Sequence, residues 1–215
     1  MLKEIFEWSS NRTFKDQPVP KDKLISVMEA GRRAPSWKNI QPWKFIAVTG
    51  VEDKVRLSEI FAIKGLIKKA PAVILCVASM KAWERSSQHR SLKELLLHSG
   101  VTMSESDIDK MYLDSVRAQS LAQNQASLMA RTFENMGIAY GFMILEAANQ
   151  GLGACILGEI DNELLTVNHE KYKEIKQYFG LDETHVITAG IIVGVPISAK
   201  GTTPRKEADE IYSFY

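Results

Sequence analysis

The sequence has only two cysteines, which lie far apart in the chain. Both stand in apolar runs, Cys76 in "AVILCVAS" and Cys155 in "LGACILG". A thiol in such surroundings is typical of a buried residue that behaves as a small hydrophobe. We therefore expect both thiols to be structural, which fits a reducing compartment.

Net charge and long apolar runs are also nearly absent. The 27 Lys and Arg residues against 26 Asp and Glu residues leave a formal net charge of +1. This balance provides no bulk attraction to nucleic acid or to a membrane surface, so local charges must bind any anion. No stretch approaches the roughly 20 apolar residues of a membrane-spanning helix. The start, "MLKEIFEWSSNR", does not resemble a secretory signal. We expect a cytoplasmic protein with no nucleic-acid or membrane partner.

Common signatures of nucleotide, metal and serine chemistry are missing as well. The glycines of "GLGACILG" lack the Gly-x-Gly-x-x-Gly spacing and follow a helical pattern, whereas a Rossmann fingerprint follows a strand. There is no Walker A sequence, and Ser36 has no Gly-x-Ser-x-Gly elbow around it. The histidines are scattered without metal-ligand spacing: His89, His98, His169 and His185. We expect no metal site.

What is present is an alternation of helical and strand patterns over 215 residues, of which 45% are hydrophobic. Helical spacing predicts helices at 2–10, 21–33, 51–61 and 126–150, the last with a strongly apolar face and with Gly151 as its left-handed cap. Apolar β-branched runs predict strands at 45–49, 71–79, 154–158 and 185–196, of which we expect the first to be covered on both faces. The alternation indicates an α/β or α+β sandwich built as one domain.

The middle of the chain is more polar. Residues 81–100 predict irregular structure with a helical piece. Ser104 is a plausible helix N-cap, since its hydroxyl can accept a hydrogen bond from a free N–H of the first turn. The helical pattern that follows is too long for one ordinary helix, so we expect a break near "QNQA", residues 123–126.

A polar loop, "RRAPSWKNIQPW", separates the helix at 21–33 from the first strand. Pro35 disfavours helical backbone at the residue before it, so the helix should stop at or before Ala34. Ser36, Lys38 and Asn39 then offer donors and acceptors suited to a heterocycle or a phosphate. An ordinary surface turn explains the same composition, because Pro, Ser and Asn are turn residues for local reasons.

Four features of the chain occur in a fixed order: Asn11-Arg12-Thr13-Phe14, the stretch Arg33-Ala34-Pro35-Ser36 with Asn39 and Gln41-Pro42-Trp43, the long helix entering "GLGACILG", and Arg205 in the tail. Together they resemble the flavin-dependent nitroreductase family. The resemblance implies a single domain, 1–215, with an α+β fold in which a small mixed sheet is flanked by helices in three layers. It also implies an intertwined homodimer that binds FMN at its interface, a substrate-side helical segment near 83–125, and a C-terminal arm, 197–215, around the partner.

The same resemblance assigns the cofactor-binding residues by position. The phosphate of FMN is implied to be held by Ser9, Ser10, Arg12 and Arg205. The polar loop is implied to reach the flavin bound by the partner subunit, through Pro35, Ser36, Trp37 and Asn39. The strand after the long helix is implied to lie near the flavin N5, with Ile156, Leu157, Gly158 and Glu159.

The chain also departs from the family pattern. Members often carry an arginine pair and a serine before the position of Arg12, whereas this chain has Trp8, Ser9 and Ser10. There is no clear match for the asparagine that commonly binds the pyrimidine edge of the flavin, and residues 63–66 offer only Lys64. Part of the expected phosphate and pyrimidine contacts is therefore missing or rearranged.

The implied function is an FMN oxidoreductase. NAD(P)H delivers a hydride to flavin N5 and is replaced by a small electron acceptor such as a nitroaromatic or a quinone. Because the chemistry belongs to the flavin, we expect no catalytic acid or base among the side chains. Lys64 or Lys68 near flavin N1 and the C2 carbonyl would stabilise the anionic reduced form.

Three alternatives stay open at the level of sequence. The chain could be a flavin-binding or redox-sensing module with little turnover, which the absence of an arginine at Trp8 favours. It could be a specialised flavin reductase or dehalogenase on the same fold. It could also be an all-helical interaction protein dimerising through residues 126–150, although the apolar strand patterns argue against this. The preference for NADH or NADPH also stays open.

Overall fold

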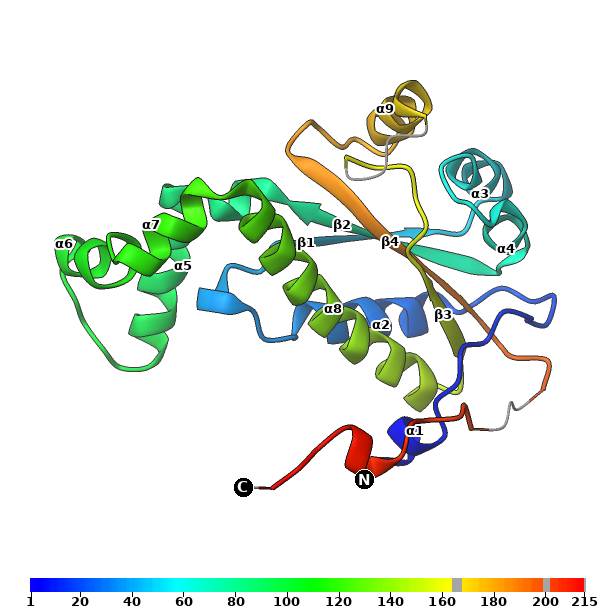
Figure 1. The fold of residues 1–215 in the computed structure, drawn as a ribbon. Coiled ribbons are helices and arrows are strands. Elements are labelled where there is room, and N and C mark those ends of the chain that lie inside the picture. The colour runs from blue at the N-terminus through cyan, green and yellow to red at the C-terminus, as the bar shows by residue number, and fades with distance from the viewer. Residues whose placement is uncertain (164–167, 199–201, 215) are drawn as a thin grey trace.

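The computed structural model describes residues 1–163, 168–198 and 202–214, and centres on a four-stranded sheet between two helical layers (Figure 1). The strands are β1 (Trp43–Val48), β2 (Ala72–Ser79), β3 (Gly153–Leu157) and β4 (His185–Gly194), in the order β1-β2-β4-β3. All three neighbouring pairs are antiparallel. The expectation of a mixed sheet is therefore wrong for the described residues. Val48 pairs with Val73, because the connection after β1 returns the chain to the end of the sheet where β1 stopped.

Helices cover both faces of the sheet. On one face lie α2 (Lys21–Arg32) and α8 (Gln125–Asn149), and on the other lie α3 (Val51–Ser58), α4 (Lys64–Lys69) and α9 (His169–Tyr178). Strand β2 serves both layers: Ile74 packs in the core under α2 and α8, and its neighbour Leu75 packs in the core under the other helices. This alternation follows from the two-residue period of a strand. It confirms the predicted three layers.

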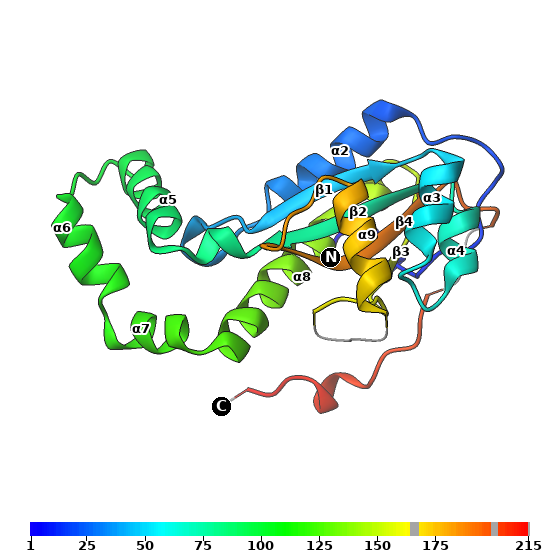
Figure 2. The same cartoon turned by 90° about the horizontal axis from the view of Figure 1, so that it is seen from above.

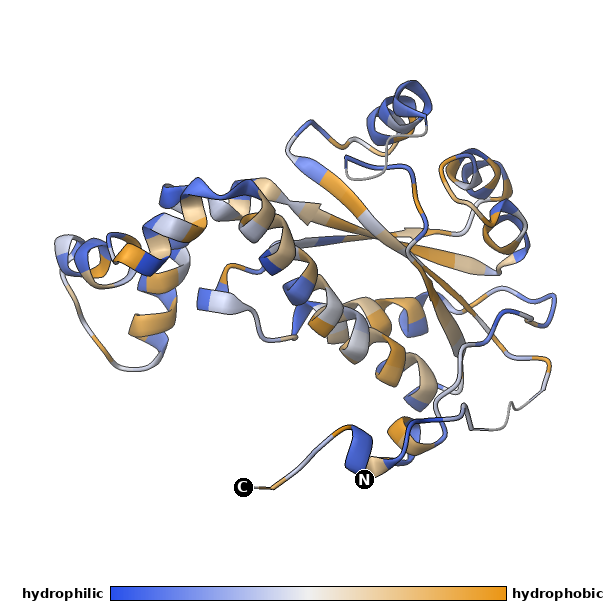
Figure 3. Ribbon diagram, viewed as in Figure 1, coloured by the Kyte–Doolittle hydropathy of each residue, from blue (hydrophilic) through white to orange (hydrophobic). Residues whose placement is uncertain are grey.

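The two central strands are buried and the first strand lies at an edge. Every residue of β4 after His185 is buried, as are residues 72–78 of β2, with Cys76 near the middle of the sheet. In β1, Lys44 and Ala47 are exposed, so full coverage of this strand is not observed. Figure 3 shows the same division, with hydrophobic residues concentrated in β2, β4 and the last turns of α8 and polar residues over α9.

Three helices project from one end of the sheet and form what we call the helical extension, residues 85–123 (Figure 2). They are α5 (Arg85–His98), α6 (Glu105–Ile108) and α7 (Val116–Gln123), with a π-helical turn, Asp109–Leu113, after α6. The irregular structure expected for 81–100 is replaced mainly by α5, preceded by the short helix η2 (Met80–Trp83). Ser104 is confirmed as an N-cap, since it accepts a hydrogen bond from the N–H of Asp107 at 3.1 Å.

The ends of the helices follow local signals. The predicted break in the long helical pattern lies at Asn124, whose carboxamide oxygen caps α8 by accepting from the N–H of Ser127 at 2.9 Å. At the other end, Gly151 has a φ of +72°, as expected of a left-handed cap. The N-terminal helix α1 (Lys3–Phe6) is shorter than predicted and leaves Leu2 and Phe6 exposed. The remaining short helices are η1 (Trp37–Asn39) and η4 (Ala208–Glu210).

No helix of the described ranges is both long and apolar enough to cross a membrane.

Candidate functional site

A cavity of about 210 Å³ joins two segments that are far apart in the sequence. Arg12 lines it from the extended segment after α1, and the last two residues of β3 line it together with the two residues that follow the strand. Phe61, which forms an isolated bridge with Ile160, also lines the cavity. The lining residues are Arg12, Phe61, Ile63, Ile156, Leu157, Gly158 and Glu159. The structure therefore brings together Arg12 and all four residues predicted at the end of β3.

The free edge of β3 provides polar backbone groups at this cavity. Strand β3 pairs with β4 along one edge, and at the other edge Asn11 donates its N–H to the carbonyl of Ala154 at 2.9 Å. Alternate residues of an antiparallel strand point their backbone groups to the same side, so Ile156 also directs its N–H and C=O to this edge. The close approach of the N-terminal segment requires Gly153, where an added Cβ would lie 2.7 Å from the Cβ of Asn11.

Arg12 is available to an anion. It is exposed and forms no hydrogen bond or ion pair within the described part of the chain. The cavity has one carboxylate, that of Glu159, whose backbone carbonyl accepts from the N–H of Ala62 at 3.0 Å. A free guanidinium beside the backbone groups of a strand edge can bind a phosphate and a polar heterocycle.

The other residues predicted to bind phosphate lie outside this cavity. Ser9 is buried and lines a separate cavity of about 390 Å³ beside α1, together with Trp8. Ser10 is partly buried and lines neither cavity. Arg205 is exposed in the tail, where its guanidinium donates to the carbonyls of Thr203 and Pro204 at 3.1 and 3.0 Å. In a single chain, Arg12 alone of this set lines the cavity next to β3.

The two lysines considered for the reduced flavin are directed elsewhere. Lys64 donates to the carboxylate of Glu59 at 2.8 Å, and Lys68 lies 3.8 Å from the same group. These contacts lower the pKa of Glu59, mainly through the hydrogen bond from Lys64. Neither lysine lines the Arg12 cavity.

The polar loop has an unusual backbone. Lys38, Asn39 and Gln41 have φ values of 50°, 55° and 44°, which place three non-glycine residues in the left-handed region within four positions. Such residues cost free energy and persist where surrounding contacts hold them, which is frequent at functional sites. A turn without function would be expected to use glycine here.

Several contacts hold this backbone. The N–H of Gln41 donates to the hydroxyl of Ser36 at 3.0 Å, and the Gln41 carboxamide donates to that of Asn39 at 3.2 Å. The N–H of Trp37 donates to the carboxamide oxygen of Asn135 at 2.8 Å. Ser36 and Asn39, predicted to contact flavin, thus also stabilise the conformation of their own loop, while Pro35 is exposed.

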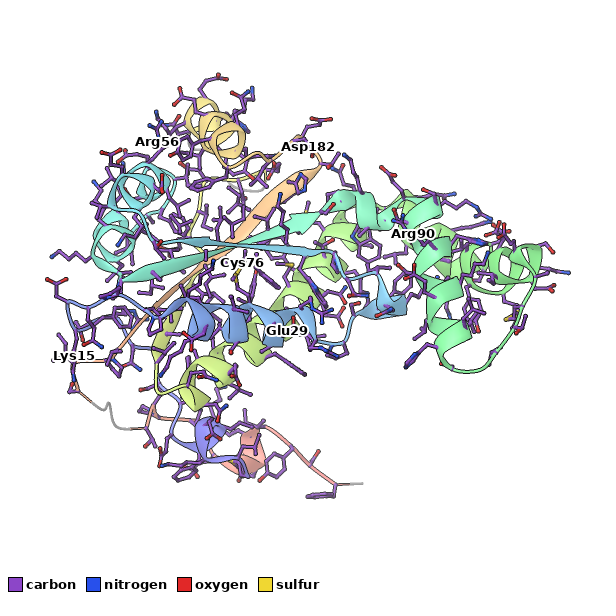
Figure 4. All side chains as sticks on the ribbon, turned by 180° about the vertical axis from the view of Figure 1, so that it is seen from behind. Lys15, Glu29, Arg56, Cys76, Arg90 and Asp182 are labelled. Carbon is purple, nitrogen blue, oxygen red and sulfur yellow. The ribbon has the colours of Figure 1, made fainter. Side chains whose placement is uncertain are left out.

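Aromatic contacts connect the loop to η2, which in turn contacts α8. The ring of Trp37 lies 5.6 Å from that of Trp83, and the indole N–H of Trp83 donates to the hydroxyl of Thr132 at 2.8 Å. The helix before the loop, α2, has charged residues at its C-terminal end. Arg32 and Arg33 donate hydrogen bonds to the carboxylate of Glu29 at 2.6 and 2.8 Å, and these bonds lower the pKa of Glu29 to about 2 (Figure 4).

No residue of the polar loop lines the Arg12 cavity. The η1 turn lies beside α5 at the base of the extension. The cavity is lined by the end of β3, which lies at a distance from α5 in the fold (Figure 1). The structure therefore does not bring Pro35, Ser36, Trp37 and Asn39 to the cavity in one chain.

Sequence reasoning missed the residues that hold the loop, namely Trp83, Thr132 and Asn135. Asn135 and Thr132 are 1% and 0% exposed within the apolar face of α8. A polar residue in the middle of an apolar helical face is a detectable signal, since buried polar groups need partners. The partner itself, Trp37, is visible only in the structure.

Comparisons with known proteins identify the family of this chain. Residues 5–195 match the nitroreductase family model. A protein of Thermus thermophilus named NADH dehydrogenase is 27% identical over 87% of this chain and 82% of its own length. The FMN reductase (NADPH) of Bacillus subtilis is 25% identical over 98% of this chain and 72% of its own length. A structure from Exiguobacterium sibiricum, solved in complex with FMN, has a TM-score of 0.74 at 18% identity and covers 99% of this chain and 96% of its own. Since the family model spans most of the chain, the predicted resemblance is confirmed, and this protein belongs to the nitroreductase family.

Proposed function

We propose that this protein is an FMN-dependent oxidoreductase that takes a hydride from NAD(P)H and passes it to a small electron acceptor such as a nitroaromatic or a quinone. The observation that carries the proposal is the juxtaposition of the free Arg12 guanidinium with the open edge of β3 at Ile156. The names of the relatives, NADH dehydrogenase and FMN reductase (NADPH), support the same class of chemistry.

The residues of the cavity fit the parts of FMN. Arg12 suits the phosphate, because a guanidinium binds phosphate oxygens through two parallel hydrogen bonds. The backbone N–H and C=O at Ile156 and the loop through Gly158 suit the polar edge of the flavin ring. FMN held there would supply the hydride-transfer chemistry between NAD(P)H and the acceptor. The protein side chains orient the ring and limit the access of water, and none needs to act as a catalytic acid or base.

A second copy of the chain completes the proposed site. One cavity holds Arg12 but not the polar loop, so the loop contacts predicted for Ser36 and Asn39 require the partner subunit. Large apolar side chains are exposed on elements that such a partner would cover, including Phe142 on α8, at 43%, and Phe6 on α1, at 68%. A homodimer accounts for both observations.

The direct test is spectroscopic. The purified protein, with FMN added, should bind the flavin, appear yellow and bleach when NADH or NADPH is supplied without oxygen. Adding a nitroaromatic or a quinone should restore the absorbance. Failure to bind FMN contradicts the proposal.

The alternative is a flavin-binding or redox-sensing module with little turnover. Trp8 in place of an arginine and the single guanidinium at the cavity favour it. Binding of FMN without measurable oxidation of either nicotinamide would select this alternative, and turnover restricted to one acceptor class would select a specialised reductase or dehalogenase.

The dimeric assignment is tested by Asn39→Ala. Because Asn39 is part of the loop and not of the Arg12 cavity, its replacement should weaken FMN retention several-fold only if the loop reaches the flavin of the partner. The measurement is the FMN dissociation constant by fluorescence, with the mass in solution from light scattering. A monomer, or an unchanged affinity with an intact loop, contradicts this assignment.

A further inference from the structure

A different cavity, of about 650 Å³, lies where the helical extension meets the polar loop, and it shares no lining residue with the Arg12 cavity. Three cationic side chains line it, from three separate elements: Lys38 of η1, Arg117 of α7 and Arg131 of α8. No acidic residue is among the lining residues, whereas the lining of the Arg12 cavity includes one cation and one carboxylate. The cavity therefore has a local excess of positive charge in a chain of nearly zero net charge.

Lys38 is a partly buried cation without an acidic partner. Its ammonium group donates to the backbone carbonyl of Tyr112 at 2.5 Å and lies 4.2 Å from the centre of the Trp37 ring. Within the described residues, no carboxylate lies within ion-pair distance of it. Burial lowers the pKa of Lys38, because the charged form loses water without gaining a counter-ion. A ligand anion would supply that counter-ion.

The two arginines add donors at the same cavity. Arg117 is exposed and makes no hydrogen bond or ion pair within the described ranges. Arg131 is paired with Glu134, which lies one turn further along α8 and does not line the cavity. A guanidinium has five N–H donors, so Arg131 retains donors for a second anion.

The remaining lining is suited to a ring. Tyr112, Met111 and Leu121 provide apolar surface, and Ser120 and Ser127 provide hydroxyl groups between them. Tyr112 and Met111 belong to the π-helical turn Asp109–Leu113. This form of helix is rare in proteins overall, and where it occurs it is often at a functional site. Apolar surface with a few convergent polar groups is the usual composition of a small-molecule site.

We propose that this cavity binds a small aromatic anion, a ring that carries a carboxylate or a phosphate. Lys38 and Arg117 bind the anionic group, and Tyr112 and Leu121 contact the ring. That the ligand is the electron acceptor rests on the proposed function. The binding itself rests on the cavity alone.

The experiment is isothermal titration calorimetry on the full chain with FMN added. The probes are 4-nitrobenzoate and its uncharged analogue 4-nitrobenzamide. The wild-type protein should bind the carboxylate about tenfold more tightly or better, since a charge-assisted hydrogen bond is worth about 1.5–3 kcal/mol. Arg117→Gln and Lys38→Asn should each reduce that preference to about threefold or less. Asn tolerates the left-handed backbone of Lys38, so this variant removes the charge while keeping the loop.

Arg90→Gln is the matched control. Arg90, labelled in Figure 4, is an exposed arginine of α5. It is not among the residues that line the cavity, so its replacement should leave the preference unchanged. A loss of preference in this variant as large as in Arg117→Gln would show a general charge effect and overturn the assignment.

A second pair of probes identifies the source of the anion. The 2′-phosphate and the adenine of NADPH combine an anionic group with an aromatic ring, as an aromatic acceptor acid does. The second pair of probes is therefore 2′-AMP and adenosine. A preference for 2′-AMP alone that Arg117→Gln abolishes assigns the cavity to NADPH, and a preference for the benzoate alone assigns it to the acceptor. Absence of a preference in both pairs overturns the proposal. Charge preference without oxidation of NAD(P)H contradicts the proposed function and leaves this site standing.

Discussion

The body of the molecule and its helical extension are held together by different forces. The sheet lies between two large apolar clusters, and residues such as Ile74 and Leu75 are completely buried. The extension has one small cluster, formed by Leu92, Ile108 and Leu113. It is otherwise held by exposed charge pairs, which contribute little each in water. The body therefore provides a rigid frame, whereas the extension can adjust at low cost.

The charge pairs of the extension form a chain across its helices. Arg85 on α5 lies 3.0 Å from Asp109 and 2.8 Å from Asp114, and Lys93 lies 2.7 Å from Glu105. Both proposed sites follow the same division. The Arg12 cavity is part of the body, where the packing of the sheet fixes the positions of the lining residues. The cationic cavity lies at the boundary with the extension.

The largest difference should appear when one leucine is removed from each region. Leu75→Ala should lower the free energy of unfolding by about 3 kcal/mol, because it opens a cavity in a core that cannot collapse. Leu92→Ala, in the small cluster, should mainly increase hydrogen exchange in α5 and shift the urea midpoint less. Equal losses of global stability in the two variants would show that the extension unfolds together with the body.

A smaller effect is expected at the polar loop, where it contacts α8. Asn135→Ala removes the acceptor of the Trp37 N–H and should cost about 1–2 kcal/mol. The loop should lose its left-handed backbone, seen as faster hydrogen exchange over 36–41 and changed tryptophan fluorescence. Asn149→Ala, at the exposed far end of the same helix, is the control and should leave both signals unchanged. Loop signals that match the wild type in Asn135→Ala would mean that the backbone of the loop does not depend on α8.

The smallest effect is expected on the stability of the extension at low pH. Hydrogen bonds from His89 and then from Arg85 hold the pKa of Asp109 below its usual range. A group with a lowered folded pKa stabilises the fold above its unfolded pKa, near 3.9, and this contribution is lost as pH falls through the folded value. Protection of α5 and α6 against hydrogen exchange should therefore fall below about pH 4, while the sheet keeps its protection.

Two variants check this origin. Asp109→Asn should show reduced protection of α5 already at neutral pH and little further loss on acidification. Asp16→Asn, in an exposed turn of the body, should behave as the wild type. Parallel loss of protection in the sheet and in the extension would contradict the assignment to Asp109.

Local signals explain the parts of the fold that could be predicted. The apolar run around Cys76 became the buried strand β2, Ser104 capped its helix, and Gly151 adopted the left-handed backbone of a cap. Each depends on neighbours within a few residues. In contrast, α5 was not recognised as a long helix, since only Gln88 and Leu92 in it are buried and its amphipathic pattern is weak.

The candidate site divides in the same way. Arg12 and the end of β3 were assigned through resemblance to the family, and the structure brings them to one cavity. The flavin contacts of Ser36 and Asn39 remain predictions, while their hydrogen bonds to Gln41 are observed. The cationic cavity was not anticipated, because Lys38, Arg117 and Arg131 are separated in the chain by helices whose packing no local pattern describes.

By itself, the sequence determined which segments are apolar enough to be buried, where helices stop, and that the chain belongs with flavin-dependent nitroreductases. The tertiary structure alone decided the antiparallel strand order, the left-handed loop and the cavities. The physical reason is the separation along the chain between the residues that interact. Burial and capping depend on adjacent residues, whereas Trp37 finds Asn135 across 98 positions, and Arg12 meets Gly158, only after the sheet and α8 have packed.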